Sequence, residues 1–260
     1  MIFNLTQPVL DSAPKFTYTG TYEYIDDGEG NWRIKFLSSG VFTPLKKMTI
    51  DAFLVGGGGG GRLATTANYA TSGGGGGYTK TVKSVELVAN TSYEIVVGSG
   101  GSADVGNTAA TDGGATSAFS GTANGGGSGK KILHGPASGG NGGSGGGASS
   151  SNSSAKAGAG GSDGSDGGNS YGAAKGGVGQ GTTTREFGES TGQLYAGGGA
   201  GYCRKSGSSA AGGDGGGGDS GDTASSGAEN TGGGGGAGKT SAGNGGSGIV
   251  VIRKHKEAAA

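Results

Sequence analysis

The chain has 260 residues, of which 70 are glycine and four are proline, and its 19 basic residues equal its 19 acidic residues in number. A balanced charge excludes the basic surface that nucleic acid or an anionic membrane would need, and the single cysteine excludes a disulfide framework. The longest aliphatic run, Ile249 to Ile252, is far shorter than the roughly 20 apolar residues of a membrane-spanning helix.

The first predicted elements form a hairpin. Residues 15–37 are rich in aromatic and β-branched side chains and are divided by turn residues from Asp26 to Asn31, which is typical of two paired strands. Along the second strand apolar and basic residues alternate, so we expect one buried face and one solvated face. The apolar residues are Trp32, Ile34 and Phe36, and the basic residues are Arg33 and Lys35.

Further strands follow along the chain. Met48 to Val55 becomes apolar on both faces toward its end, which predicts a strand in the interior of a sheet. Tyr78 to Lys83 and Thr91 to Val97 are separated by a turn, and we expect them to pair antiparallel. The last strand, Ile249 to Ile252, can bury its aliphatic side chains only by joining an existing sheet. Residues 98–248, with almost no strand signal, would then leave one β-scaffold and return to it.

Long runs of glycine occupy most of this excursion and also form Gly56 to Gly61 and Gly73 to Gly77. Such runs have no apolar surface to bury, so they are either disordered or held by backbone hydrogen bonds. The low content of charged residues, 15%, and the aromatic residues between the runs favour order. Glycine can adopt the extended polyproline II helix, whose N–H and C=O groups point outward and can bond to neighbouring helices. We therefore expect a compact slab of polyglycine II helices.

Segments rich in side chains interrupt the slab, and we expect them to be surface loops, where binding residues concentrate. They are residues 62–72, 130–138, 149–156, 182–195, 202–206 and 224–231. The candidate receptor-binding residues are basic and aromatic side chains in or near these segments: Arg62, Tyr69, Lys130, Lys131, His134, Tyr171, Arg185, Phe187, Tyr195, Tyr202 and Arg204. For each aromatic residue, covering an end or a face of the slab is an equally good interpretation.

The predicted fold class is all-β plus polyglycine II. An antiparallel β-sandwich scaffold carries a large inserted bundle of polyglycine II helices, with essentially no α-helix, because no segment has apolar residues at helical spacing. We expect residues 1–40 to be an N-terminal hairpin and attachment segment, 41–98 with 247–254 the scaffold, 99–246 the glycine-rich insertion, and 255–260 a C-terminal tail.

Several motifs that look catalytic are rejected. Residues 233–240 match the phosphate-binding P-loop, and Gly56, Gly58 and Gly61 match a dinucleotide-binding fingerprint, but the sequence predicts no helix after either motif. The two histidines have no partners at metal-ligand spacing, and the aspartates of the glycine-rich region lack the spacing of a calcium loop. We therefore expect no enzymatic activity, no cofactor and no metal site.

The order of the elements resembles a known domain. A strand ending Phe53-Leu54-Val55, the two glycine blocks, a strand ending Tyr93-Glu94-Ile95-Val96-Val97-Gly98 and the terminal Gly245-Gly246-Ser247-Gly248-Ile249-Val250-Val251-Ile252-Arg253 follow one another. This order is similar to the glycine-rich domain of bacteriophage tail-fibre and related surface proteins, and the terminal motif is its most specific part. In principle the chain is also similar to the tip adhesins of T-even-type phages, in which a polyglycine II sandwich displays receptor-binding loops.

The resemblance implies a non-enzymatic tail-fibre or tail-tip protein of a phage or prophage. Its loops would recognise a protein or glycan on the host-cell surface, and its N-terminal segment would dock to other virion or tail subunits, without nucleic acid or membrane insertion. The expected location is the virion tail or the extracellular medium, after synthesis in a bacterial cytoplasm without a signal peptide. The alternative is a structural subunit that polymerises or decorates a filament or capsid, and either protein could be a homo-oligomer. An ice-binding protein fits less well, because charged loops interrupt the slab.

Overall fold

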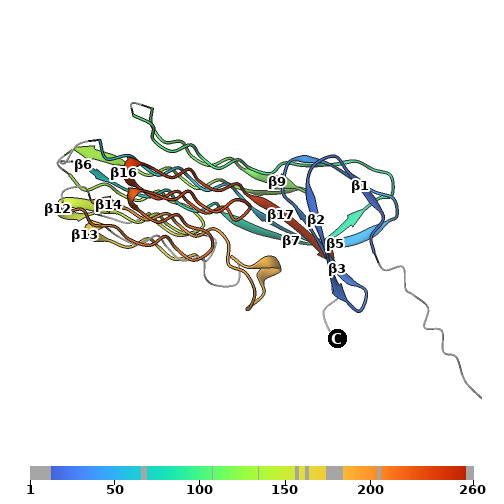
Figure 1. The fold of residues 1–260 in the computed structure, drawn as a ribbon. Coiled ribbons are helices and arrows are strands. Elements are labelled where there is room, and N and C mark those ends of the chain that lie inside the picture. Colours follow the sequence, from blue (N-terminus) through green and yellow to red (C-terminus); the bar gives the residue numbers. More distant parts are fainter. Residues whose placement is uncertain are drawn as a thin grey trace, which may run out of the picture.

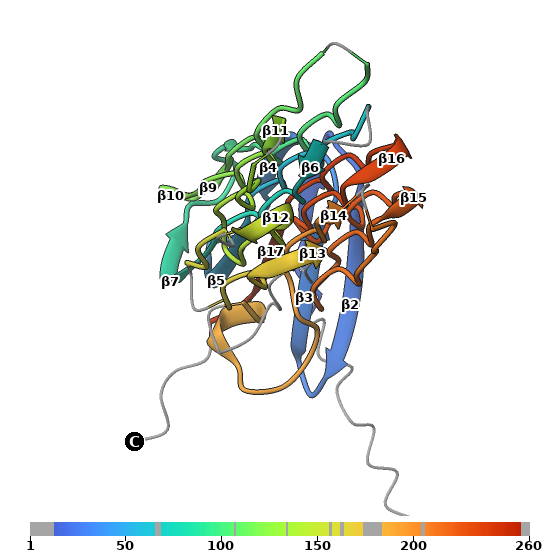
Figure 2. The same ribbon diagram turned by 90° about the vertical axis from the view of Figure 1, so that its left-hand side faces the viewer.

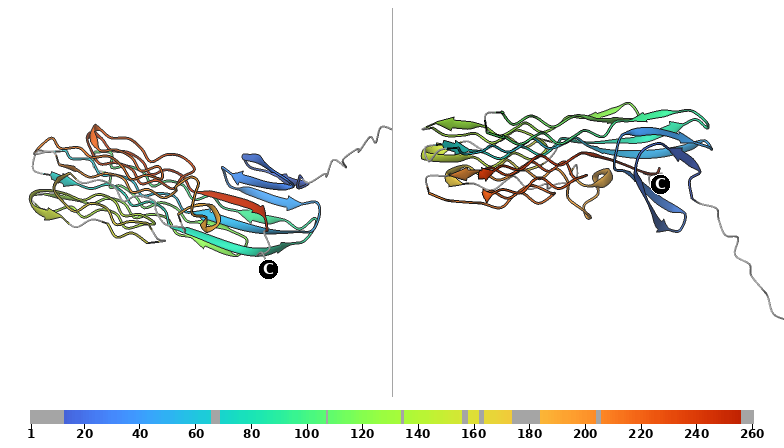
Figure 3. Two further views of the ribbon diagram at one scale, coloured as in Figure 1. Left: turned by 90° about the horizontal axis from the view of Figure 1, so that it is seen from below. Right: turned by 45° about the horizontal axis from the view of Figure 1, so that its top comes forward.

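A computed structural model describes residues 13–65, 69–106, 108–133, 135–155, 158–161, 164–173, 184–203 and 206–255. The molecule is elongated, with its larger β-sheet at one end and a glycine-rich body extending from that sheet (Figures 1 and 3). Within the described residues the fold is all-β, and the only helical element is one turn of 3₁₀ helix, η1 (Glu186–Gly188).

The larger sheet has five antiparallel strands. In spatial order they are β2 (Tyr22–Gly28), β3 (Asn31–Phe36), β17 (Ile249–Lys254), β5 (Met48–Val55) and β7 (Thr79–Leu87). The predicted hairpin is confirmed as β2 and β3, and β5 is an interior strand as expected. The aliphatic strand β17 joins the sheet between β3 and β5, which buries its side chains from Ile249 to Ile252.

A second sheet contains three strands, β1 (Phe16–Tyr18), β4 (Gly40–Pro44) and β8 (Tyr93–Ile95). The expected pairing of Tyr78–Lys83 with Thr91–Val97 is wrong, because β7 pairs with β5 whereas β8 pairs with β4. The intervening turn is bound to the second sheet: the N–H of Asn90 donates to the carbonyl of Pro44 at 2.7 Å. Strands on two facing sheets can both point apolar residues into one core, so their alternation did not reveal this arrangement.

The two sheets share one hydrophobic core. Trp32, Ile34 and Phe36 enter it from β3, as their alternation predicts, and Phe42 and Ile95 enter it from β4 and β8. The rings of Phe36 and Phe42 meet edge to face with their centroids 5.4 Å apart, a favourable aromatic geometry. The strand β1 also belongs to this second layer, since it pairs with β4 and not with the hairpin.

The glycine-rich body consists of Gly56–Gly61, Gly73–Gly77 and the glycine-rich parts of residues 98–248. At its centre lies Gly56–Gly61, the direct continuation of β5, whose successive N–H groups donate to three neighbouring segments in turn. Gly56 donates to Tyr78 and Gly59 donates to Gly75. Gly57 and Gly60 donate to Gly114 and Thr111, respectively. Gly58 and Gly61 donate to Gly246 and Gly243, respectively, and all six N···O distances are 2.9 to 3.0 Å. The same neighbour therefore returns at every third residue.

Contacts between backbones exclude side chains from this centre. A Cβ atom built on Gly58 would lie 2.0 Å from the carbonyl oxygen of Gly233, and one on Gly59 would lie 2.1 Å from that of Gly127. Real Cβ atoms do not approach backbone so closely. The body thus requires glycine because its chain segments touch through their main chains.

Short strands lie at the end of the body farthest from the large sheet, which we call the distal end (Figure 2). They are β6 (Tyr69–Thr71) between β11 (Lys131–Leu133) and β14 (Tyr202–Cys203), the pair β12 (Ser149–Ala155) and β13 (Ser170–Ala173), and the pair β15 (Gly221–Thr223) and β16 (Gly238–Ser241). Nearer the large sheet, β9 (Thr116–Ala118) pairs with β10 (Gly121–Ala123).

These strands correct two expectations. Residues 98–248 contain more strand structure than their sequence indicates, and four of the expected loops contain paired strands: residues 62–72, 130–138, 149–156 and 202–206. Most of these strands have only two to four residues, which is too short for an alternating pattern to be recognised.

Candidate functional site

The distal end brings together side-chain-rich segments that are far apart in the sequence. Tyr69, Lys131 and Tyr202 lie on adjacent strands of one sheet, since β6 pairs with both β11 and β14. Tyr171 lies on β13, at the same end (Figure 2). For Tyr69 and Tyr171 only the backbone is described, and the predicted residues His134 and Arg204 lie outside the described residues.

Two of the predicted basic residues share a buried carboxylate. Asp104 is buried, and one of its carboxylate oxygens lies 3.5 Å from Nε of Arg62 and 3.4 Å from Nζ of Lys131. A buried charge is costly without partners, so this cluster holds both cations in place. Lys130, the residue beside Lys131, is exposed. Among these lysines, Lys130 is the one that faces solvent freely enough to contact a large ligand.

The tyrosine of β14, Tyr202, is hydrogen-bonded to a residue of β15. The buried hydroxyl of Tyr202 donates to Oδ1 of Asp222 at 2.8 Å, and Oδ2 of Asp222 lies 3.3 Å from Nζ of Lys239. Asp222 is exposed and Lys239 is partly exposed, and the hydroxyl of Thr240 beside them donates to the backbone carbonyl of Asp222. Asp222, Lys239 and Thr240 together form a polar surface, and none of the three is among the predicted binding residues.

An exposed apolar residue lies on β11 beside the two lysines. Ile132 is 41% exposed on β11, between Lys131 and Leu133. A large apolar side chain beside charged groups is typical of surfaces that bind other molecules, although single exposed apolar residues are common on all proteins. The distal end therefore offers apolar contact at Ile132 in addition to charged and hydrogen-bonding groups.

Arg185, Phe187 and Tyr195 lie elsewhere, in the segment of residues 184–195 that packs against the large sheet. The rings of Phe187 and Tyr195 are buried against Phe53 of β5, with centroid distances of 6.4 and 5.4 Å. The guanidinium carbon of Arg253 lies 4.1 Å from the centroid of Phe187. These two aromatic residues therefore cover a face of the scaffold, which was the second interpretation open for them.

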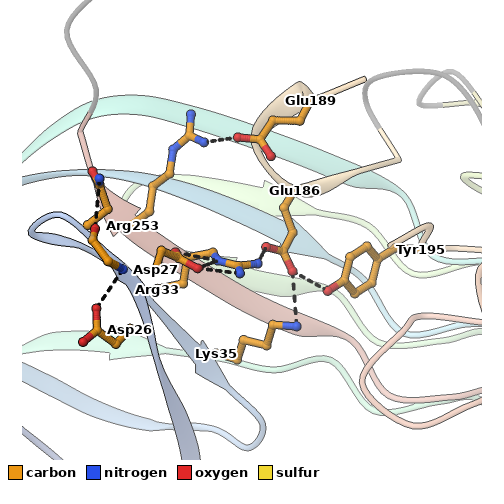
Figure 4. A network of polar contacts seen from close by, with 10 residues as sticks. Asp26, Asp27, Arg33, Lys35, Glu186, Glu189, Tyr195 and Arg253 are labelled. Carbon is orange, nitrogen blue, oxygen red and sulfur yellow. Dashed lines mark hydrogen bonds and ion pairs between the residues drawn. The ribbon is translucent and has the colours of Figure 1, made fainter. Parts of the chain in front are cut away.

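Glu186 fixes this segment to the sheet, as Figure 4 shows. Its buried carboxylate accepts hydrogen bonds from Nη1 of Arg33 and from the hydroxyl of Tyr195, both at 2.7 Å, and lies 3.3 Å from Nζ of Lys35. The basic face of β3, expected to be solvated, is thus partly covered by this segment. Arg33 and its partner Glu186 are 153 residues apart in the sequence, so no local pattern could predict this contact.

Electrostatics agree with this anchoring role. Burial alone would raise the pKa of the Glu186 carboxyl, but hydrogen bonds from Tyr195 and Arg33 and the charge of Lys35 outweigh burial and hold the pKa below its ordinary value. Burial, followed by the charge of Glu186, raises the pKa of the Tyr195 hydroxyl. The carboxylate is therefore ionised at neutral pH, and the phenol is protonated and can donate.

The P-loop match and the single cysteine both lie within the described residues. The residues of the P-loop match end in β16, at the position where that chemistry requires a helix. Its lysine, Lys239, pairs with Asp222. Cys203 is buried, and its sulfur lies 3.3 Å from the carbonyl oxygen of Ser150.

The sequence matches the family model of a glycine-rich domain over residues 37–255. The chain therefore belongs to this glycine-rich domain family. No curated protein matches the chain. Across the described residues, no helix has the length and apolar character needed to cross a membrane.

Proposed function

We propose that this protein is a non-enzymatic tail-fibre or tail-tip protein of a phage or prophage that recognises a host-cell surface through its distal end. The observation that carries the proposal is the gathering of side-chain-rich segments on β6, β11, β13, β14, β15 and β16 at the end of the molecule opposite its large sheet. Binding residues are commonly displayed in this way on a rigid scaffold. The ligand would be a protein or a glycan of the host surface.

The proposal includes the conformation of the body. We infer that its glycine segments are polyglycine II helices packed on a β-sandwich. The return of the same hydrogen-bonded neighbour at every third residue supports this, because such a helix has three residues per turn and no internal hydrogen bonds. Lateral hydrogen bonds between backbones would make the body stiff enough to hold the distal end in one shape.

The experiment is a binding assay on intact cells. Fluorescently labelled protein is added to a panel of bacterial strains and bound protein is measured by flow cytometry. We expect strong binding to a subset of strains and a loss of roughly tenfold or more when Lys130→Glu and Ile132→Asp are combined at the distal end. Lys83→Glu, an exposed change at the large sheet, is the control for reversal of one lysine charge and should bind like the wild type.

Two results would contradict this function. The first is an absence of binding to every strain of a broad panel, while the protein is folded by circular dichroism. The second is equal binding by the distal variant and the wild type, which would place the recognition surface elsewhere on the molecule.

A second candidate, a structural subunit that polymerises, is favoured by the edge strand β2. This strand is exposed along most of its length, and its residues Tyr22 and Tyr24 are 44% and 39% exposed. Long exposed edge strands can pair with strands of other molecules. Filaments in electron micrographs of the purified protein, lost on changing Tyr24 to Lys, would support this candidate over the first.

A further inference from the structure

A cavity of about 800 Å³ opens at the sheet end of the molecule, away from the distal end. It lies where β3, β5, β7 and β17 meet the segment that precedes β1. Its lining residues come from five separate parts of the chain, and Trp32 and Met48 are the large apolar residues among them. Strands of the large sheet contribute part of this wall and give it a firm support; their lining residues are Trp32, Met48, Thr49, Ser84, Glu86 and Lys254.

The wall and rim of this cavity are basic. Lys15, Lys46, Lys47 and Lys254 line it together with His255, whereas Glu29 and Glu86 are its acidic residues. Lys47 is already paired with Glu86 at 3.1 Å. Lys46 and Lys254 are exposed at the rim. The chain as a whole has no net charge, so this local excess of positive charge is a property of the cavity.

His255 is held in a fixed orientation at the wall. Its Nδ1 lies 2.6 Å from Oδ1 of Asp51, a buried carboxylate that also pairs with Nε of Arg253 at 3.2 Å. The N–H of Ser84 donates to the same Asp51 oxygen at 3.1 Å. With Nδ1 engaged by Asp51, the imidazole can meet a ligand only through Nε2.

Exposed apolar side chains lie next to the basic rim. Leu45 precedes Lys46 and is 46% exposed. Val88 follows Leu87, the residue of β7 that pairs with Met48, and is 58% exposed. A ligand that satisfies this surface must therefore offer acidic groups to the lysines and apolar groups to Leu45, Val88 and the cavity. A polypeptide with both acidic and apolar side chains meets this requirement, whereas a purely acidic sugar polymer supplies only the charge.

We propose that this cavity is a docking site for an acidic, partly apolar segment of a partner protein. The inference does not depend on the proposed function, since it concerns the opposite end of the molecule and a different kind of ligand. In an assembly the two ends would act separately: the sheet end would hold the protein to its partner, and the distal end would stay exposed.

The test uses Trp32, the single tryptophan of the chain, whose side chain lines the cavity. The probe is a short capped peptide of alternating glutamate and leucine, titrated into the full chain while tryptophan emission is recorded. We expect a saturable change in emission, which weakens as salt is added because the attraction is between exposed charges. A peptide in which lysine replaces glutamate should cause no change.

Two double variants locate the site. Lys46→Glu with Lys254→Glu reverses two charges at the cavity, and we expect roughly tenfold weaker peptide binding. Lys80→Glu with Lys83→Glu makes the same change of net charge at exposed positions of β7 that do not line the cavity, and it should bind like the wild type. All four lysines are exposed, so both variants should keep the melting temperature of the wild type.

The proposal is overturned if the acidic peptide leaves the emission of Trp32 unchanged at low salt. It is also overturned if both double variants weaken binding equally, because the attraction would then be a general effect of net charge. Displacement of the peptide by alginate at equal carboxylate concentration would show that charge alone determines binding, and this too contradicts a peptide site.

Discussion

At the scale of single residues, Gly59 illustrates why the body is built from glycine. Its N–H donates to the carbonyl of Gly75 and its carbonyl accepts from the N–H of Gly235, both at 2.9 Å. Its Cα faces the carbonyl of Gly127 so closely that a methyl group has no room. The residue therefore bonds through its backbone to two chain segments and touches a third.

The corresponding prediction concerns Gly59→Ala. We expect a loss of about 1–3 kcal/mol in the free energy of unfolding, because the added Cβ must displace a hydrogen-bonded backbone. Gly221→Ala is the control: its Cβ would lie 3.5 Å from the carbonyl oxygen of Thr223, an ordinary contact. This variant should be neutral or stabilised by up to about 1 kcal/mol, since alanine restricts the unfolded chain. Urea unfolding curves measure both, and equal stability of the two variants would contradict close backbone packing.

A second prediction at this scale concerns Glu186→Gln. Glutamine keeps an acceptor for Tyr195 but leaves Arg33 and Lys35 without the buried negative charge, so we expect a loss of about 1–3 kcal/mol in the free energy of unfolding. Glu189→Gln removes an ion pair of a half-exposed carboxylate with Arg253 and should cost less than about 1 kcal/mol. Denaturant unfolding at neutral pH compares the two variants.

The pH dependence of stability should differ between Glu186→Gln and the wild type. The folded-state pKa of Glu186 is lowered, and so is that of Asp51, where hydrogen bonds from His255, Ser84 and Arg253 outweigh the effect of burial. A lowered folded-state pKa gives stabilisation that is complete above the unfolded-state pKa, near 4, and is lost as pH falls through the folded-state value. The wild type should therefore lose stability below about pH 4 more steeply than Glu186→Gln. Parallel pH profiles of the melting temperature would contradict the assignment.

At the scale of elements, β17 connects the two hydrophobic cores. Val250 and Ile252 face the core shared with the second sheet, while Ile249 and Val251 face the opposite side, where Phe187 and Tyr195 pack. A strand buried on both faces reads as a continuous aliphatic run, which is why its position could be predicted.

This arrangement predicts that substitutions on both faces of β17 are costly. Val251→Ala and Ile252→Ala should each lower the free energy of unfolding by about 2–4 kcal/mol, because each leaves a cavity in a fully packed core. On the edge strand β2, Tyr24→Ala should cost less than about 1 kcal/mol, since its side chain is partly exposed. A mild effect of Val251→Ala in thermal unfolding would show that residues 184–195 do not cover that face.

The elements that sequence reasoning recovered are those with a local signal. The β2–β3 hairpin has a turn and an alternating pattern, and β17 has its aliphatic run. The pairing of β7 was not recoverable, because a turn between two strands does not say whether they share a sheet. The short strands of the distal end lack a pattern altogether, since main-chain hydrogen bonds alone define them.

The receptor-binding role of the candidate residues stays a prediction, and the structure gives only their positions. Arg62 and Lys131 meet at Asp104 and are largely buried, whereas Lys130 beside them is exposed, a difference that residue type alone could not predict. Aromatic character could not separate covering residues from contact residues, and Tyr202 is buried. The pairing of Asp222 with Lys239 could not be predicted, because the aspartates of this region lack the spacing of a known motif and Lys239 belongs to the rejected P-loop match.

At the scale of the whole molecule, the sheets and the body are continuous. The strand β5 runs directly into Gly56–Gly61, and the segment that bonds to Gly58 and Gly61 leads into β17. Neighbours of the central segment come from parts of the chain as distant as residues 75 and 246. Loss of either region would therefore remove the partners of the other, and the two should unfold together.

This coupling is tested by two probes on one sample. Trp32 fluorescence reports on the sheet end, and hydrogen exchange by mass spectrometry reports on the amides of Gly56–Gly61. We expect both to give the same free energy of unfolding, because each of those amides is hydrogen-bonded and buried. Gly59→Ala should lower both values by the same amount, although Trp32 lies in the sheet core and not in the body. Fast deuterium uptake across Gly56–Gly61 while Trp32 remains native would instead mean that the glycine segments are loose connections, unable to support a surface at the distal end.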